Sequence, residues 1–201
     1  LNMHYTIADP KTFGISEYEP VLPIYHSGQP EDSKEHCSDL LHRLDRIDPD
    51  RLSPENAYTY RLLHRSLEND LALADFPYYN EPLSPSSGMQ SQLPVLLAEY
   101  TFRTKRDVTD YLALLDQIDD YFASLLLYEQ EKAAAGFFMP ACSSEKVRKQ
   151  CDTIVTTEEL AQGTHFLQTT FEDRLSELQK QGLFTPEETA SLIETNDRLL
   201  A

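Results

Sequence analysis

Helix-start signals recur along this chain of 201 residues, and each one precedes apolar residues at helical spacing. Ser53-Pro54 offers a capping hydroxyl followed by proline at the first helical position. Thr104 with Asp107, and Thr185 with Glu188, have the spacing of capping boxes. No segment shows convincing strand alternation. The pattern predicts an all-α fold of about seven or eight helices, the first of them paired as antiparallel hairpins.

Proline and glycine positions set the expected boundaries. Residues 1–30 contain four prolines and no helical periodicity, which predicts an extended N-terminal arm followed by a helical domain over 31–201. Residues 157–163 are ambiguous. The last helix has no stop signal, so we expect the domain to be truncated from a longer chain. The expected helices cover residues 32–47, 53–75, 93–100, 104–135 with a break near 116–118, 144–156, 166–181 and 185–201.

The composition is strongly acidic. Asp and Glu number 34 against 17 Lys and Arg, which gives a formal net charge of -17. Phosphate backbones and anionic membrane surfaces repel such a polyanion, so no nucleic acid is expected as a partner. No apolar run approaches the ~18 residues of a membrane-spanning helix, so no transmembrane segment is expected.

The three cysteines, Cys37, Cys142 and Cys151, match no zinc ribbon and no Cys-x-x-Cys redox site. Buried free thiols are the favoured interpretation, and a Cys142–Cys151 disulfide is the alternative in an exported protein. Cys37 lies on the apolar stripe of the first helix, whereas His36 and His42 point to other faces. This arrangement favours a structural thiol over a thiol–imidazole pair.

Two other groups of residues have ordinary explanations. His64 and Glu68 are four residues apart on a predicted helix, and we interpret them as a surface pair rather than as half of a metal site. Ser84, Ser86, Ser87 and Ser91 of the predicted loop 77–92 have no visible base or acid beside them. Turn formation explains them better than nucleophilic catalysis does.

Four segments of the chain resemble the N-terminal half of bacterial proteins in the domain of unknown function 885 family. They are LNMHYTIADPKTFGI (1–15), YYNEPLSPSSGMQSQLPVLLAEYTF (78–102), DVTDYLALLDQIDDYF (107–122) and EQEKAAAGFFMP (129–140). The most specific piece is 85–94, where Gly88, Gln90, Gln92, Leu93 and Pro94 follow the family's order. The resemblance covers most of the chain.

Members of that family are similar to all-helical zinc metallopeptidases that carry a His-Glu-x-x-Pro-Gly-His motif in their second half. Two imidazoles of such a motif hold Zn²⁺, and the glutamate activates the metal-bound water. The motif is absent from these residues. We therefore assign no catalytic residue, no metal ligand and no cofactor to this segment, and we expect it to lack hydrolase activity alone. Zinc would belong to the full-length protein.

The resemblance implies a non-catalytic N-terminal helical domain that forms one wall of a substrate cleft in a zinc-dependent peptidase. It implies a peptide substrate and the missing C-terminal half as partners. It also implies an extracellular or cell-surface location, with a lipid anchor on a removed N-terminal segment. A stand-alone helical binding or interaction module of the bacterial cell surface is the alternative. The gene downstream of Ala201 discriminates the two, since only the enzyme continues into a helix with His-Glu and a second His.

The predicted substrate-binding residues are Gly88, Gln90 and Gln92. A glycine permits close approach of a ligand to the backbone, and uncharged amides can bind a peptide backbone without reading its sequence. The alternative is that this loop packs against the missing half of the protein.

Overall fold

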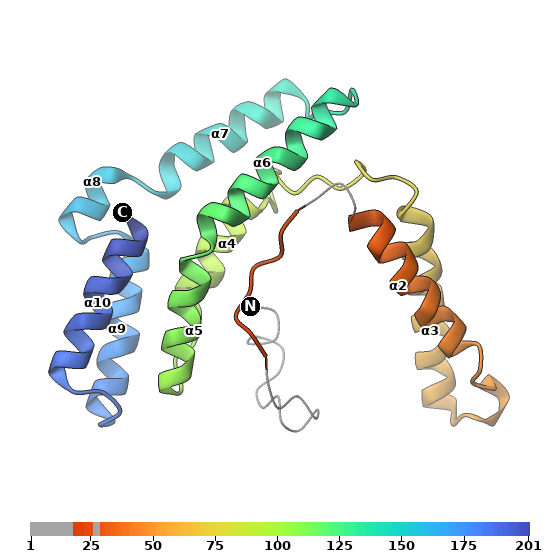
Figure 1. Ribbon diagram of the computed structural model, residues 1–201, viewed down its shortest axis with the longest axis horizontal. Helices are drawn as coiled ribbons and strands as arrows, with labels where there is room; N and C mark the ends of the chain where they lie inside the picture. Colours follow the sequence, from red (N-terminus) through yellow and green to blue (C-terminus); the bar gives the residue numbers. More distant parts are fainter. Residues whose placement is uncertain (1–17, 26–28) are drawn as a thin grey trace. The chain divides into compact units, whose positions relative to one another are not determined.

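The computed structural model describes residues 18–25 and 29–201. The described residues form helices and no β-strand, which confirms the predicted all-α class (Figure 1). Most of the predicted arm, including the resemblance segment 1–15, lies outside the described residues, and residues 18–25 contain no helix. The helices are α2 (Gln29–Leu44), η2 (Pro49–Arg51), α3 (Pro54–Leu73), α4 (Met89–Ala98), α5 (Lys105–Leu115), α6 (Ile118–Ala134), α7 (Ala141–Ile154), α8 (Thr157–Gln162), α9 (Phe166–Lys180) and α10 (Pro186–Leu200).

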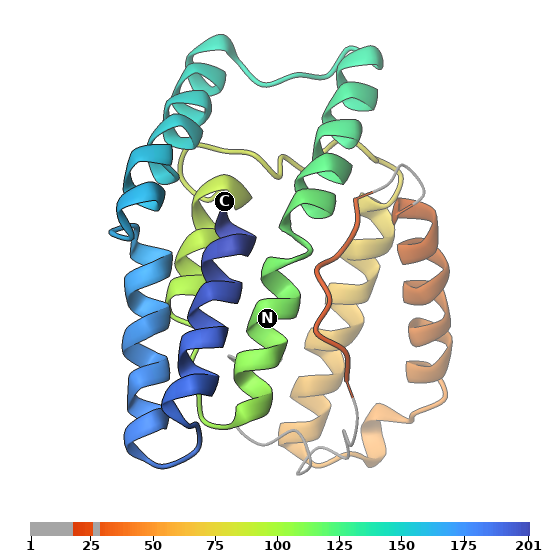
Figure 2. The same cartoon turned by 60° about the vertical axis from the view of Figure 1, so that its left-hand side comes forward.

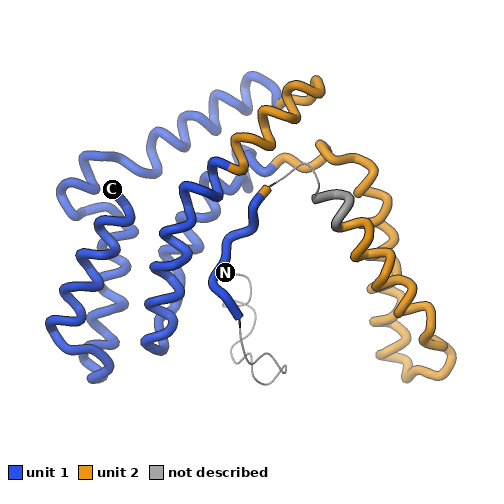
Figure 3. The backbone as a smooth tube through the Cα atoms, viewed as in Figure 1, with its two compact units in different colours: residues 1–24, 82–123, 139–201 blue, residues 25–81, 124–138 orange. Residues whose placement is uncertain are grey.

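The chain divides into two compact units (Figure 3). Unit 1 comprises the residues up to 24, 82–123 and 139–201, and unit 2 comprises 25–81 and 124–138. The boundary crosses α6 after Ala123. The predicted domain over 31–201 follows the chain, whereas these units follow contacts in space, so each unit is described by itself.

Unit 2 contains the α2–α3 hairpin, whose helices run antiparallel as predicted (Figure 1). Cys37, Leu44 and Leu67 form its buried core, which places Cys37 in the structural role expected for it. The Ser53 hydroxyl accepts a hydrogen bond from the amide of Asn56, so Ser53 is the predicted N-cap of α3. Ile47 and Leu63 follow the apolar spacing of the hairpin helices but are exposed.

Unit 1 is built around an aromatic cluster on α5 and α9. Tyr111 and Phe171 are fully buried and stack with ring centroids 5.4 Å apart. Phe102 packs edge-on against both rings at 5.5 Å. The Thr104–Asp107 capping box fixes the start of α5 beside this cluster. Offset and edge-on ring pairs stabilise a core beyond the area that they bury, so this cluster anchors the unit.

Arg174 joins α9 to the end of α4 within unit 1. Its Nη1 donates hydrogen bonds to the carbonyls of Leu97 and Tyr100, and its guanidinium lies 4.5 Å from the centroid of the Phe102 ring. The carbonyls at a helix C-terminus lack partners inside the helix. Arg174 satisfies them with a positive charge, which the helix dipole favours at this end.

Residues 18–24 run beside α5 and the start of α6 as extended chain (Figure 2). Gln117 pairs with this segment in both directions, since its Oε1 accepts from the amide of Leu22 at 3.0 Å and its Nε2 donates to Pro20 O at 2.8 Å. Arg106 donates to Tyr18 O at 2.7 Å. These polar contacts, rather than buried apolar side chains alone, fix the described part of the predicted arm.

Several predicted helix boundaries are corrected. α2 begins at Gln29 instead of 32, α4 at Met89 instead of 93, and α7 at Ala141 instead of 144. A helix that starts at residue 93 would have Pro94 in its first turn, but Pro94 is the sixth residue of α4. It removes only the bond to Gln90 O, while the amides of Ser91 and Gln92 already bond to Gly88 O and start the helix. The ambiguous 157–163 stretch forms α8, and the predicted break between α5 and α6 is confirmed.

Candidate functional site

The loop before α4 folds tightly against itself at Gly88. The amide of Gly88 donates to Ser84 O at 3.0 Å, and the amide of Met89 donates to Pro82 O at 2.9 Å. A Cβ atom on residue 88 would lie 2.3 Å from Ser84 N and 2.6 Å from Ser84 O. Backbone atoms cannot give way as a flexible side chain can. Residue 88 is therefore glycine for steric reasons inside the loop, whatever ligand approaches from outside.

Gln90 holds the same loop to α7. The Gln90 side chain is only 4 % exposed. Its Nε2 donates to Ser84 O at 2.7 Å and to Gln150 Oε1 at 2.9 Å, while Gln150 Nε2 donates to Pro85 O at 2.9 Å. Both donor hydrogens of the Gln90 amide are therefore used within the protein. Gln150 had no signal in the sequence, because it lies 60 residues from its partner.

Gln92 is exposed on α4, in contrast to Gln90. The three predicted substrate-binding residues are thus close in sequence but differ in surroundings. Gly88 is buried in the loop, Gln90 connects the loop to α7, and Gln92 has an accessible amide. Of the three, only Gln90 borders the cavity described next. Their role toward a substrate remains a prediction.

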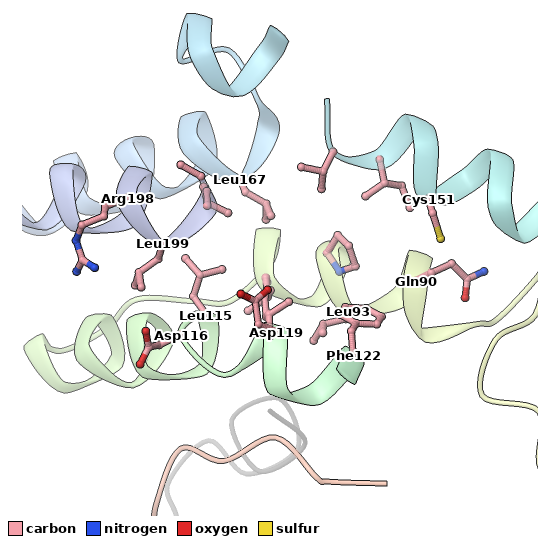
Figure 4. A pocket seen from close by; sticks show the side chains of 17 residues that line it. Gln90, Leu93, Leu115, Asp116, Asp119, Phe122, Cys151, Leu167, Arg198 and Leu199 are labelled. Atoms are coloured by element: carbon pink, nitrogen blue, oxygen red, sulfur yellow. The ribbon is translucent and has the colours of Figure 1, made fainter. Parts of the chain in front are cut away.

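A cavity of about 530 Å³ lies inside unit 1, next to α4 (Figure 4). Its walls come from α4, the junction of α5 and α6, the end of α7, the start of α9 and the end of α10. This volume falls within the range of about 300–1,000 Å³ typical of small-molecule sites. The apolar lining residues are Leu93, Pro94, Leu97, Leu115, Ile118, Phe122, Ile154, Val155, Leu167, Leu199, Leu200 and Ala201.

The polar lining of the cavity includes three charged residues, Asp116, Asp119 and Arg198. All three residues are exposed, and their side chains form no ion pair or hydrogen bond with another described residue. Figure 4 shows Asp116 and Arg198 toward the α10 end of the cavity, with Asp119 between them and Phe122. An apolar interior with a few charged groups at its opening is the usual composition of a ligand site.

His165 closes the wall between α7 and α9. Its side chain is 1 % exposed, its Nδ1 accepts from the amide of Leu167 at 3.3 Å, and its Nε2 lies 2.8 Å from Ile154 O. Because a carbonyl only accepts, Nε2 is the donor and Nδ1 the acceptor. Ile154 and Leu167 both line the cavity, so this imidazole positions two of its walls.

The cysteines are all free in the structure, so the alternative Cys142–Cys151 disulfide is not formed. The expectation of buried thiols holds for Cys37 but is wrong for Cys142 and Cys151, which are exposed. Cys151 borders the cavity, and partial burial, followed by the negative charge of Asp152, raises the pKa of its thiol. A raised pKa disfavours the thiolate, which is the nucleophilic form.

The described residues offer no set of three or more side chains placed to hold a metal ion. His64 comes nearest, with Nε2 3.2 Å from Asp45 and Nδ1 3.5 Å from Glu68. Both ring nitrogens face carboxylates rather than a common point, as expected for a surface pair. The described residues therefore do not fit the zinc ion that the family resemblance implies.

The fold and the cavity define an all-helical domain with an apolar pocket. A family model described as "Bacterial protein of unknown function (DUF885)" matches residues 11–198. The chain belongs to this family, which confirms the resemblance found in the sequence. No curated protein matches the chain.

One solved structure with a similar fold is described as the "putative lipoprotein from Colwellia psychrerythraea". It is 15 % identical to this chain with a TM-score of 0.71, and the match covers 99 % of this chain and 34 % of that protein. The chain therefore spans about a third of the length of this structural neighbour. Among the described helices, none has the length and apolar character needed to cross a bilayer.

Proposed function

We propose that this chain is the non-catalytic helical part of a longer, exported zinc-dependent peptidase, and that it forms one wall of the substrate cleft. The observation that carries the proposal is the apolar cavity beside α4, the helix in which the most specific resemblance segment, 85–94, ends. Membership of the family and the threefold greater length of the structural neighbour support a protein that extends beyond these residues.

The structural neighbour's description as a "putative lipoprotein" supports a cell-surface location for the longer protein. In this proposal the metal ligands and the general base come from the remaining polypeptide. The present residues supply shape, apolar surface and hydrogen-bonding groups. Among the three predicted substrate-binding residues, Gln92 is the one whose side chain is exposed. Peptide substrates and the remaining polypeptide are then the two partners of this domain.

The test uses the longer gene product and the 201-residue chain side by side. We expect the longer protein to purify with about one zinc per chain by elemental analysis and to cleave members of a peptide library. Chelation should abolish the cleavage and added zinc should restore it. We expect the 201-residue chain to cleave none of the same peptides. A longer protein that neither binds zinc nor cleaves any peptide would argue strongly against a peptidase.

A stand-alone binding module of the cell surface is the second candidate, and one observation favours it. The lining residues of the cavity all belong to unit 1, so the cavity requires no contribution from unit 2. Sequencing the gene beyond Ala201 separates the two functions. A stop codon or a linker would select the module, and a helix with His-Glu and a second His would select the peptidase.

A further inference from the structure

The cavity in unit 1 combines a buried apolar wall with charge at its opening. Leu93 and Leu97 on α4 are each 1 % exposed, so this wall is fixed by packing rather than adjustable. Ile118 and Phe122 extend the apolar surface along the start of α6. Burial of apolar surface contributes roughly 25 cal/mol per Å², so a ligand gains affinity here by placing an apolar group inside.

The charged groups at the opening of the cavity determine which polar groups a ligand can carry next to its apolar group. Asp116 and Asp119 contribute two negative charges and Arg198 one positive charge, on a chain whose net charge is -17. This balance attracts a cation next to the apolar group and repels a fatty acid or another anionic amphiphile. Arg198 adds a donor for a carbonyl oxygen beside that cation.

We propose that this cavity binds the amino-terminal residue of peptides that begin with a large apolar side chain. The side chain occupies the apolar space between Phe122 and Val155, above the packed floor of α4, and the free ammonium group pairs with the carboxylate of Asp119. Arg198 donates to the first peptide carbonyl. This inference rests on the proposed function, because it names the substrate end recognised at the same site, but its test requires no zinc.

The binding test uses the 201-residue chain and titration calorimetry with the tripeptide Leu-Gly-Gly. The matched ligands are acetyl-Leu-Gly-Gly, which lacks the positive charge, Asp-Gly-Gly, which lacks the apolar side chain, and hexylamine, which lacks the peptide. We expect Leu-Gly-Gly to bind at least about tenfold more tightly than each of the three, because each of them lacks one of the groups that the cavity recognises. Equal binding of the acetylated peptide, or of hexylamine, would overturn the proposal.

Two pairs of variants test the location of the site. Asp119→Asn removes the carboxylate at the cavity, whereas Asp120→Asn changes its exposed neighbour on α6, which does not line the cavity. Val155→Trp fills the cavity from the end of α7, whereas Val95→Trp adds the same ring to an exposed position of α4 outside it. We expect Asp119→Asn and Val155→Trp to weaken Leu-Gly-Gly binding about tenfold or more, with both controls within about twofold of wild type. The location is contradicted if the two control variants also lose binding, or if Asp119→Asn and Val155→Trp keep it.

The longer protein distinguishes this inference from the proposed function. A longer protein that cleaves peptides with an unchanged KM for Leu-Gly-Gly in Asp119→Asn would refute the inference and leave the peptidase function standing. If binding depends on Asp119 in a longer protein that neither holds zinc nor hydrolyses peptides, the inference stands and the peptidase function is refuted. If the 201-residue chain binds the tripeptide but the longer protein does not, the cavity is an internal interface, and the inference is wrong.

Discussion

Gly88 packs closely against the backbone of Ser84, and its replacement should weaken the fold. A methyl group on residue 88 would overlap the backbone of Ser84, which the amide of Gly88 also contacts by a hydrogen bond. We expect Gly88→Ala to lower the free energy of unfolding by about 1–3 kcal/mol, the usual range for overpacking. Urea unfolding measures the change. Ser86→Ala, at an exposed position of the same loop, should stay within about 0.5 kcal/mol of wild type.

Asn196 is the least explained polar residue of the described chain. It is 1 % exposed on α10, and neither its amide nitrogen nor its amide oxygen has a hydrogen-bond partner among the described residues. Burying an amide without a partner costs about 1–3 kcal/mol in proteins. We therefore expect Asn196→Leu to raise the free energy of unfolding by about 1–2 kcal/mol in urea unfolding experiments.

The control for this change is Glu194→Leu, at an exposed position of the same helix, which should have little effect. A loss of stability in Asn196→Leu would mean that the amide has a partner, such as an enclosed water molecule, and would contradict the prediction.

Single residues were predictable where the signal is local. Gly88 was singled out from the order of residues in segment 85–94, and the structure adds the steric reason for a glycine there. Gln150 and His165 could not be found in the same way, because each acts on a residue elsewhere in the chain: Gln150 on the loop before α4, and His165 on Ile154. Their positions carry no pattern in the sequence. Such partners become visible only when the helices are packed.

Helix ends were predictable where a capping residue is recognisable in the sequence. The Thr104–Asp107 and Thr185–Glu188 capping boxes are both formed, and Gly136, with φ 89°, ends α6 in a left-handed backbone conformation. The start of α4 was missed because its N-cap, Gly88, makes no side-chain hydrogen bond. Backbone bonds to Pro82 and Ser84 hold this end instead. The cavity was not predicted at all, since it requires side chains from five separate parts of unit 1.

The junction of α7 and α9 depends on one side chain, that of His165. It caps α9 through Leu167 and bonds to Ile154 at the end of α7. We expect His165→Ala to cost about 1–3 kcal/mol of unfolding free energy, through loss of the cap and of the buried hydrogen bond. His165→Asn should recover part of the loss, because asparagine is a good N-cap but is too short to reach Ile154. His36→Ala, at an exposed position, is the matched control. Equal stability of His165→Ala and wild type would show that the junction does not need the imidazole.

In unit 2 the loop before residue 82 is attached to α6 by a buried charged cluster. Lys132 is 4 % exposed, and its Nζ lies 2.6 Å from Glu81 and 3.6 Å from Glu129. Burial, and then the negative charge of Glu81, raise the pKa of the Glu129 carboxyl above its ordinary value of 4.5. Burial and the charges of Glu129 and Glu81 also raise the pKa of Tyr128 to about 12. Two carboxylates thus share one ammonium group.

This cluster predicts a pH dependence with a definite sign. A carboxyl whose pKa is raised on folding holds its proton more tightly in the folded state, so stability is lost as pH rises from 4.5 through the raised value. We expect Glu129→Gln to gain stability relative to wild type over this window, with no difference below it. Urea unfolding of both proteins between pH 4 and pH 8 measures the difference. A difference that is constant with pH would contradict the raised pKa. Glu145→Gln, at an exposed position, is the control for the loss of one negative charge.

At the scale of the whole molecule, fold class and charge were the features that the sequence determined best. Apolar spacing and caps specify helices locally, so the all-α class needs no knowledge of packing. The division into two units was not predictable, because unit 1 collects three separate stretches of chain and the boundary falls inside a continuous helix.

The net charge of -17 leads to a prediction for the whole chain. Repulsion among like charges destabilises a compact state, and the Debye length falls from about 30 Å at 0.01 M salt to about 8 Å at 0.15 M. We expect Tm to rise by several degrees between 10 and 300 mM NaCl in a calorimetric scan at constant protein concentration. Sodium chloride is the appropriate salt, because sulfate would also strengthen apolar burial. A fall in Tm with increasing salt would show that ion pairs outweigh the repulsion. The same negative charge predicts that the chain does not shift a 20-base-pair DNA duplex in a gel at 10 mM NaCl.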